Sequence, residues 1–112
     1  MIKEDCIFCK IANGQIPCNF VYETEDIVAF DDLNPQAPIH TLIIPKEHFE
    51  TLEEVNDPKL LSNLLLAVKE VAKIKGAKNG FRTVINTKQD GGQEVFHLHI
   101  HVLAGRKLGT LG

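Results

Sequence analysis

Residues 96–102, Phe-His-Leu-His-Ile-His-Val, form the stretch of sequence that decides how this chain folds and where its reactive groups lie. Side chains alternate between the two faces of a β-strand, so a strand here places all three histidines on one face and the aliphatic residues between them in the core. Histidine has an ordinary pKa of about 6.5 and can act as nucleophile, acid, base or metal ligand near neutral pH. The pattern predicts a strand with one structural face and one reactive face.

The three imidazoles could share one metal ion or divide the chemistry between them. In a straight strand, side chains two residues apart are separated by about 6.6 Å, and the outer pair by about twice that distance. Zinc–nitrogen bonds are about 2.0–2.1 Å long, so the spacing disfavours one ion bound by all three rings. His99 is the best candidate for a nucleophile, because its neighbours or nearby carbonyls can fix its tautomer and leave one ring nitrogen free to attack.

A loop with two glycines comes directly before the histidine stretch, at Asp90-Gly91-Gly92-Gln93. Glycine adopts positive φ at no steric cost, and a turn that exposes backbone N–H groups can bind an anion. A phosphate held there would lie beside His99, and His101 could contact it. A plain turn is the alternative for such a glycine pair.

Two cysteines near the N-terminus, Cys6 and Cys9, have the spacing that places both thiols on one side of a helix. Zinc would need two further ligands, and His48 and His97 are available imidazoles. Two free or buried thiols are the alternative, and a redox pair is disfavoured because the motif does not follow the first strand of a βαβ unit. Cys18 makes the cysteine count odd, which argues against a disulfide framework, and we assign it no role.

Length and charge limit the class of protein. A chain of 112 residues is sufficient for one domain, and a net charge of −3 with a pI near 5.9 gives no broad attraction to nucleic acid or to an anionic membrane. No apolar run reaches the roughly 18 residues needed to span a bilayer, and the N-terminus lacks the basic start and apolar stretch of a signal peptide. We therefore expect a cytoplasmic protein with a small ligand.

The hydrophobic pattern predicts strands that form one sheet, with the helices on one side of it. A short helix is expected over Cys6–Ile11 with Asp5 as a possible N-cap, and a long amphipathic helix from Asp57-Pro58 to Gly76. Strands are expected at residues 20–23, 27–30, 41–44, 82–86 and 95–104. The first two have the spacing of an antiparallel hairpin, and the third is apolar enough to be central.

Five segments resemble those of the histidine triad (HIT) nucleotide-binding family, in the order in which that family has them. They are residues 6–11 (Cys-Ile-Phe-Cys-Lys-Ile), 30–38 (Phe-Asp-Asp-Leu-Asn-Pro-Gln-Ala-Pro), 40–46 (His-Thr-Leu-Ile-Ile-Pro-Lys), 91–96 (Gly-Gly-Gln-Glu-Val-Phe) and 97–103 (His-Leu-His-Ile-His-Val-Leu). The resemblance covers nearly the whole chain. It implies a single HIT domain over residues 1–112 and points to the bacterial branch of purine nucleoside phosphoramidases.

The resemblance also implies a fold and an activity. The fold is α+β, with a five-stranded antiparallel sheet, one long and one short helix, and a homodimer in which two sheets join into one of ten strands. The activity is hydrolysis of the P–N bond of purine nucleoside 5′-phosphoramidates, such as adenosine, guanosine or aminoacyl-adenylate-like substrates. The middle histidine attacks phosphorus, the amine leaves, and water releases the nucleoside monophosphate. No organic cofactor is implied.

Residue by residue, the resemblance makes His99 the catalytic nucleophile, and it places Asp32 against the ribose and Leu33 against the base. The phosphate site would be lined by Asn86, Gly92, Gln93, Glu94 and His101. Some relatives have serine where this chain has Glu94. Because a carboxylate would repel a phosphate, we expect the backbone N–H of Glu94 to make that contact.

Zinc-bearing relatives use two N-terminal cysteines, a histidine shortly after Pro-Lys, and the first histidine of the triad. All four are present here, as Cys6, Cys9, His48 and His97. Four protein ligands leave no open position, so the implied zinc is structural.

Two other functions stay open on the sequence. One is a dinucleoside polyphosphate hydrolase, which has a similar triad and a different leaving group. The other is a nucleotide-binding regulatory protein whose main task is to bind a protein partner. Neither a nucleic acid nor a membrane is expected as partner.

Overall fold

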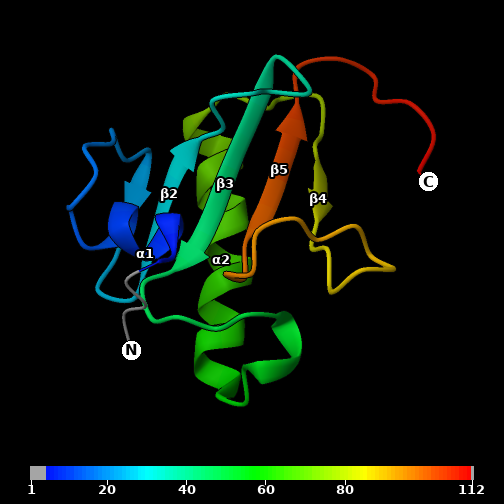
Figure 1. Ribbon diagram of the computed structural model, residues 1–112. Helices are drawn as coiled ribbons and strands as arrows, with labels where there is room; N and C mark the ends of the chain where they lie inside the picture. Colours follow the sequence, from blue (N-terminus) through cyan, green and yellow to red (C-terminus); the bar gives the residue numbers. More distant parts are fainter. Residues whose placement is uncertain (1–4, 112) are drawn as a thin grey trace.

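The protein is described by a computed structural model, in which residues 5–111 are placed. Its centre is an antiparallel five-stranded sheet in the order β1-β2-β3-β5-β4 (Figure 1). The strands are β1 (Tyr22–Glu23), β2 (Ile27–Asp31), β3 (Ile39–Pro45), β4 (Arg82–Val84) and β5 (Ile100–Ala104). The predicted hairpin of β1 and β2 and the central place of β3 are confirmed.

The long helix α2 (Pro58–Ile74) begins as its sequence predicts. The Asp57 carboxylate accepts a hydrogen bond from the backbone N–H of Lys59 at 3.0 Å, and Pro58 occupies the first turn, where its missing N–H costs nothing. Gly76 follows the helix with φ +75°, a conformation that glycine adopts most readily. A single turn of 3₁₀ helix, η1 (Leu52–Glu54), precedes α2.

The short helix α1 (Ile7–Ala12) differs from the prediction at its start. Its N-cap is Cys6 and not Asp5, because the Cys6 Sγ atom accepts a hydrogen bond from the backbone N–H of Cys9 at 3.3 Å. The cap therefore depends on a thiol that also takes part in a buried side-chain cluster described below.

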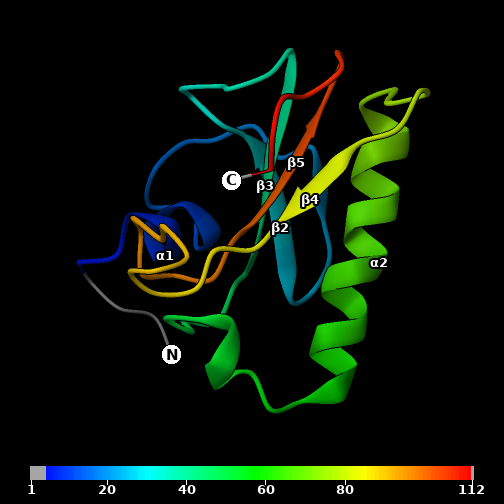
Figure 2. The ribbon, with the colours of Figure 1, turned by 90° about the vertical axis from the view of Figure 1, so that its right-hand side faces the viewer.

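The prediction that both helices lie on one side of the sheet is wrong. Figure 2 shows α2 and α1 on opposite sides of the strands. The side chains of β2 and β3 are apolar on both faces: Ile27 and Ile43 pack with α2, whereas Val28 and Ile44 pack with α1. A strand that is apolar on both faces needs a cover on each side.

The histidine stretch is a strand over only part of its predicted length. The register pairs Ile43 of β3 with Ile100 of β5, so continued pairing would bring Pro45 opposite Leu98. Proline has no N–H to give, and the N–H of Leu98 donates instead to the Phe49 carbonyl at 2.7 Å. β5 therefore begins at Ile100, although Leu98, Ile100 and Val102 all lie in the core beneath α2, as predicted.

None of the helices within residues 5–111 has the length and apolar character needed to cross a membrane. The cytoplasmic location expected from the sequence stays a prediction.

Candidate functional site

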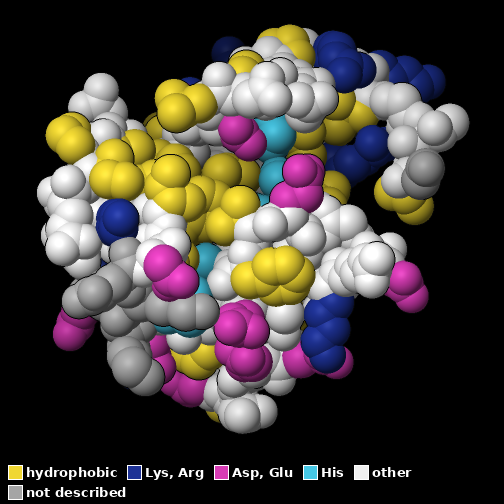
Figure 3. Space-filling model, viewed as in Figure 1, with side chains coloured by type: hydrophobic (Ala, Val, Ile, Leu, Met, Phe, Trp, Pro, Cys, Tyr) yellow, Lys and Arg dark blue, Asp and Glu magenta, His cyan; other side chains and the backbone are white. Residues whose placement is uncertain are grey.

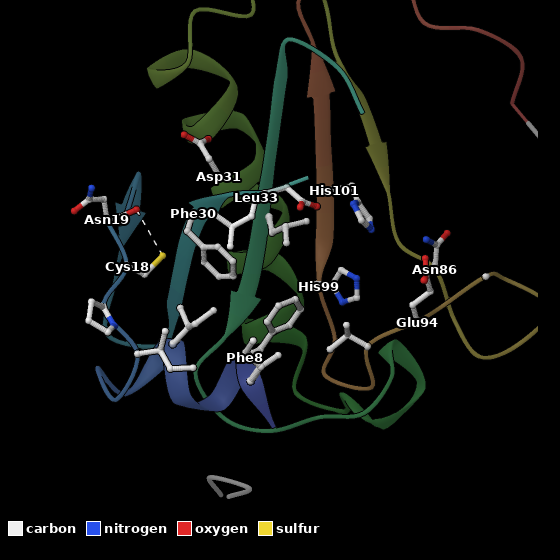
Figure 4. Close-up of a pocket in the computed structure, with 18 residues that line it drawn as sticks. Phe8, Cys18, Asn19, Phe30, Asp31, Leu33, Asn86, Glu94, His99 and His101 are labelled. Carbon is white, nitrogen blue, oxygen red and sulfur yellow. Dashed lines mark hydrogen bonds between the residues drawn. The ribbon is translucent and has the colours of Figure 1, made fainter. Parts of the chain in front are cut away.

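A pocket of about 820 Å³ opens on the α1 side of the sheet. Figure 3 shows it as a hollow with histidines at its floor, between apolar and acidic side chains. Figure 4 shows Phe8 of α1 and Phe30 of β2 on one side of His99, and Asn86 and Glu94 on the other. Of the predicted nucleotide-binding residues, those that line the pocket are Asp32, Leu33, Asn86, Gly92, Glu94, His99 and His101.

His99 is held in one tautomer. Its Nδ1 atom lies 2.8 Å from the main-chain carbonyl of His97, and since a carbonyl can only accept, Nδ1 carries the proton. In the neutral imidazole, Nε2 therefore keeps its lone pair. The ring of Phe8 packs edge-on against the imidazole, with centroids 5.2 Å apart, and only 8% of His99 is exposed. In its neutral form the ring thus presents a fixed nitrogen with a free lone pair at the floor of the pocket, as a nucleophile requires.

His101 is held in the opposite tautomer through His40, a residue for which the sequence predicts no role. The backbone N–H of Gln36 donates to His40 Nδ1 at 2.9 Å, so neutral His40 carries its proton on Nε2 and donates it to His101 Nδ1 at 2.9 Å. Neutral His101 then bears its own proton on Nε2. Leu42 of β3 pairs with His101 across the strands. His40 is two residues before Leu42 in the same strand, so its side chain lies on the same face of the sheet as His101. This alternation is the signal that could have identified His40.

Burial keeps His101 neutral. Desolvation, together with the neighbouring imidazoles of His99 and His40, lowers the pKa of His101 to about 4, although Asp32 acts in the opposite direction. Near pH 7 His101 therefore offers an N–H donor without a positive charge.

Asp32 and Leu33 lie where the chain leaves β2. One oxygen of Asp32 accepts a hydrogen bond from the backbone N–H of Asn34 at 2.9 Å, and the other lies 3.5 Å from His40 Nε2. The side chain of Leu33 is fully exposed at the rim of the pocket. The Asp32 carboxylate can thus accept hydrogen bonds from sugar hydroxyls, and the neighbouring exposed Leu33 side chain can pack against a flat ring.

The glycine loop differs from the expected anion cradle. Gly92 has φ +80°, but its N–H donates to the Gln89 carbonyl at 3.0 Å, and the N–H of Gln93 donates to the Lys88 carbonyl at 3.0 Å. Within residues 5–111, the backbone N–H of Glu94 makes no such bond. The loop therefore offers a phosphate fewer N–H groups than its sequence suggests.

Gln93 is not brought to the pocket surface. Its side-chain oxygen accepts from the Lys88 N–H, and its side-chain nitrogen donates to the carbonyls of Glu50 at 2.7 Å and Val95 at 3.0 Å. This buried amide braces the loop, and Gln93 is not among the residues that line the pocket.

The charged side chains that line the pocket are all acidic: Asp31, Asp32 and Glu94, with no lysine or arginine among the described lining residues. Asp31 is compensated from outside the pocket, by Lys75 at 2.9 Å and Thr41 at 2.9 Å. Partial burial acts to raise its pKa, but these hydrogen bonds hold that pKa below its usual value. A phosphate bound here would therefore depend on imidazoles and neutral N–H groups rather than on lysine or arginine.

A second cluster lies next to the pocket, behind the first histidine of the triad. The His97 Nδ1 atom lies 3.2 Å from Cys6 Sγ and 3.5 Å from Cys9 Sγ, and His48 Nδ1 lies 3.3 Å from Cys9 Sγ. The four candidate ligand atoms are all within 4.8 Å of one another. The structure thus brings together the four residues predicted as metal ligands.

The donor set fits a structural zinc ion. His97 Nε2 donates to the Pro45 carbonyl at 2.8 Å, which leaves Nδ1 unprotonated and directed at the thiols, as a ligating histidine requires. Burial lowers the pKa of His97 to about 4, so the ring is neutral near pH 7. His48 directs Nδ1 at Cys9, and its other ring nitrogen, Nε2, is buried with no hydrogen-bond partner among the described residues, so His48 lacks the outer hydrogen bond that His97 makes to Pro45. His97 turns toward the thiols while His99 and His101 face the pocket, so the triad does not act as one ligand set.

Comparison with known proteins gives a consistent result. The family model of the HIT domain matches residues 13–108. Protein HitA of Neisseria gonorrhoeae is 51% identical over 89% of this chain and 95% of its own length. A histidine triad protein from Clostridium difficile has a TM-score of 0.93 and 48% identity over the whole of both chains. A HIT family hydrolase from Legionella pneumophila has a TM-score of 0.88 and 48% identity, covering 94% of this chain and 96% of its own.

Proposed function

The chain belongs to the HIT domain family, and on that premise we propose that it is a purine nucleoside phosphoramidase that uses His99 as nucleophile. The observation that carries the proposal is the His99 ring, whose Nδ1 proton is held by the His97 carbonyl and whose free Nε2 faces a large pocket. The similar protein from Legionella pneumophila is named a HIT family hydrolase, which agrees with a hydrolytic reaction.

The proposed reaction has two steps at phosphorus. In the first, His99 Nε2 bonds to phosphorus, the P–N bond of the substrate breaks, and the leaving nitrogen takes up a proton from solvent and departs as an amine. In the second, water attacks phosphorus, the bond to His99 breaks, and the monophosphate is released with one proton returned to solvent. His101 Nε2–H donates to a phosphoryl oxygen in both steps and stabilises the charge that develops there.

The pocket has a separate place for each part of the substrate. Asp32 would accept hydrogen bonds from the ribose hydroxyls, and Leu33 and Phe30 would pack on the purine. The backbone N–H of Glu94 and the side chain of Asn86 would meet the phosphate. The pocket volume of about 820 Å³ is within the range for a nucleotide-sized ligand.

Electrostatics favour a phosphoramidate over a dinucleoside polyphosphate. A polyphosphate leaving group carries several negative charges, which proteins ordinarily neutralise with arginine, lysine or a metal ion. Here the described lining residues include three carboxylates and neither lysine nor arginine. The single phosphate of a phosphoramidate suits such a pocket better.

We also propose that Cys6, Cys9, His48 and His97 hold a structural zinc ion. Bound zinc would tie the start of α1, through Cys6 and Cys9, to the segment that precedes β5. It would supply no chemistry to the reaction, because four protein ligands leave no open position. The cysteines lie outside the residues that the HIT family model matches, so the proposal rests on this chain's own geometry.

We propose a homodimer that forms through the β4 edge of the sheet, one of its two edges; β1 forms the other. β4 pairs with β5 on one side only, and an edge strand with unpaired N–H and C=O groups can pair with a second copy. Phe81, just before β4, is exposed and would add apolar contact area.

The test of the proposed function is a substrate panel with purified wild-type protein and His99→Ala. We expect wild type to release AMP from adenosine 5′-phosphoramidate, to turn over diadenosine polyphosphates much more slowly, and to lose about 10⁴-fold in turnover on loss of the nucleophile. Circular dichroism of the variant checks that it folds. Retained turnover by His99→Ala, or faster cleavage of diadenosine polyphosphates by wild type, would contradict the proposal.

A further inference from the structure

Glu94 is the pocket residue whose charge the proposed reaction leaves unexplained. Its carboxylate lines the same pocket as His99 and is exposed there. Within residues 5–111 it has no ion-pair or hydrogen-bond partner, whereas Asp31 is paired with Lys75 and Asp32 is bonded to the Asn34 N–H. A phosphate site would be expected to avoid an uncompensated negative charge.

The position of Glu94 is set by its neighbour in the chain. Gln93 is anchored by three hydrogen bonds from its buried side-chain amide, to Lys88, Glu50 and Val95. The backbone at this point is therefore fixed, and the next side chain leaves it toward the pocket. Figure 4 shows Glu94 beside Asn86, on the far side of His99 from Phe8 and Phe30.

The reaction geometry says which part of the substrate meets this carboxylate. The apolar side of the pocket, with Phe8, Phe30 and Leu33, takes the nucleoside, and the phosphorus lies over His99. An in-line displacement expels the leaving group on the side of phosphorus opposite the nucleophile. Because His99 is at the floor, the amine departs toward the mouth, where the Glu94 carboxylate is exposed.

We propose that Glu94 determines the specificity for the leaving group by charge, and that the enzyme prefers phosphoramidates whose leaving amine carries a further positive charge. This inference rests on the proposed function and adds to it a class of substrate: nucleoside phosphoramidates of diamines and other cationic amines. The Glu94 carboxylate attracts the cationic group and repels a carboxylate or phosphate at the same place. Its backbone N–H still meets the phosphate, so the two parts of one residue serve different parts of the substrate.

The experiment uses three adenosine phosphoramidates that share the nucleotide and the chain length of the amine. The amines are 1,3-diaminopropane (cationic), 3-methoxypropylamine (neutral) and 4-aminobutanoate (anionic). We expect the ratio of kcat/KM for the cationic to the anionic substrate to fall by about tenfold or more in Glu94→Gln, which keeps the shape and removes the charge, and to reverse in Glu94→Lys. Comparing the ratio between variants cancels differences in the intrinsic reactivity of the three amines.

Asp90→Asn is the matched control, since it removes the same charge from the same loop at an exposed residue that does not line the pocket. We expect it to leave the ratio unchanged. A ratio that is the same in wild type and Glu94→Gln, or that falls equally in Asp90→Asn, would overturn the inference.

A binding measurement separates this inference from the proposed function. Calorimetric titration of the cationic and anionic compounds into His99→Ala, with and without Glu94→Gln, reports the charge preference without turnover. If wild type cleaves none of the three compounds, the proposed function fails, and equal affinities of His99→Ala for the two charged compounds would still overturn the charge preference. A preference that disappears with Glu94→Gln would support it.

Discussion

Two regions of the molecule use the same histidine stretch but differ in burial and in what their rings face. One is the cluster of Cys6, Cys9, His48 and His97, and the other is the pocket around His99 and His101. Cys9 and His97 are fully buried, and their polar atoms face one another. His99 and His101 line an open pocket of about 820 Å³. One residue type, repeated at one spacing, therefore takes its chemistry from the groups that the rest of the fold places opposite each ring.

The two regions meet at His97. Its ring belongs to the cluster, whereas its main-chain carbonyl holds the Nδ1 proton of His99. Phe8 touches both imidazoles, with ring centroids 5.9 Å from His97 and 5.2 Å from His99. The cluster therefore supports the pocket through the backbone and through packing.

The strongest test of the comparison is Cys9→Ser. Cys9 is fully buried and contacts both cluster histidines, so its loss should release the proposed zinc and lower the free energy of unfolding by at least about 3 kcal/mol. Metal analysis and thermal unfolding with and without a chelator measure both effects. Cys18→Ser is the control: Cys18 is exposed and outside the cluster, so we expect its zinc content to match wild type and its stability to change by less than about 0.5 kcal/mol. A wild type that purifies without zinc and is indifferent to chelator would break the comparison.

A second test sharpens the division at His97. His97→Ala removes the ring from the cluster but keeps the carbonyl that orients His99. We expect loss of zinc, as for Cys9→Ser, together with a decrease in turnover of about tenfold, far less than the decrease for His99→Ala. Steady-state kinetics at a temperature where both variants are folded make the comparison. An equal loss of turnover in the two variants would mean that the regions are not separable.

The smallest expected effect is on the pH dependence of stability. The pKa of His101 is about 4 in the folded protein, below the usual value of about 6.5, so the unfolded chain binds more protons between these values. The contribution of neutral His101 to the free energy of unfolding is therefore full above about pH 6.5 and is lost as the pH falls toward about 4. Between pH 7 and pH 5, we expect the free energy of unfolding of His101→Asn to fall by about 1 kcal/mol less than that of wild type, allowing for the partial exposure of the ring. Denaturant unfolding at pH 7, 6 and 5 measures it, and His97, whose pKa is lowered in the same direction, keeps its share in the variant. If the free energy of unfolding depends on pH in the same way in His101→Asn and in wild type, the acid sensitivity arises from other groups.

Much of the fold could be predicted because local signals agree with the tertiary structure. Asp57 and Pro58 start α2, and the apolar run of β3 makes it central, each for a reason that lies within a few residues. The start of β5 could not be predicted, because it depends on Pro45 in the neighbouring strand. The place of α1 could not be predicted either, since nothing local says which face of a two-sided sheet a short helix will cover.

The candidate site divides in the same way. His99 follows from its position among three histidines, but His40 was missed because its role depends on strand register. Gln93 and Gly92 show the reverse case: their sequence suggests phosphate contacts, yet the structure uses the Gln93 side chain and both backbone N–H groups to brace the loop.

Local sequence was enough to predict the main helices and strands, the alternation that buries Leu98, Ile100 and Val102, and the residue types able to do the chemistry, because these depend on local periodicity and on the nature of each side chain. Folding sets which ring turns to the thiols and which to the pocket, and which nitrogen of each neutral ring carries the proton. A tautomer is fixed by the hydrogen-bond partner of the ring, and the partners of His97, His99 and His101 are brought to them by folding.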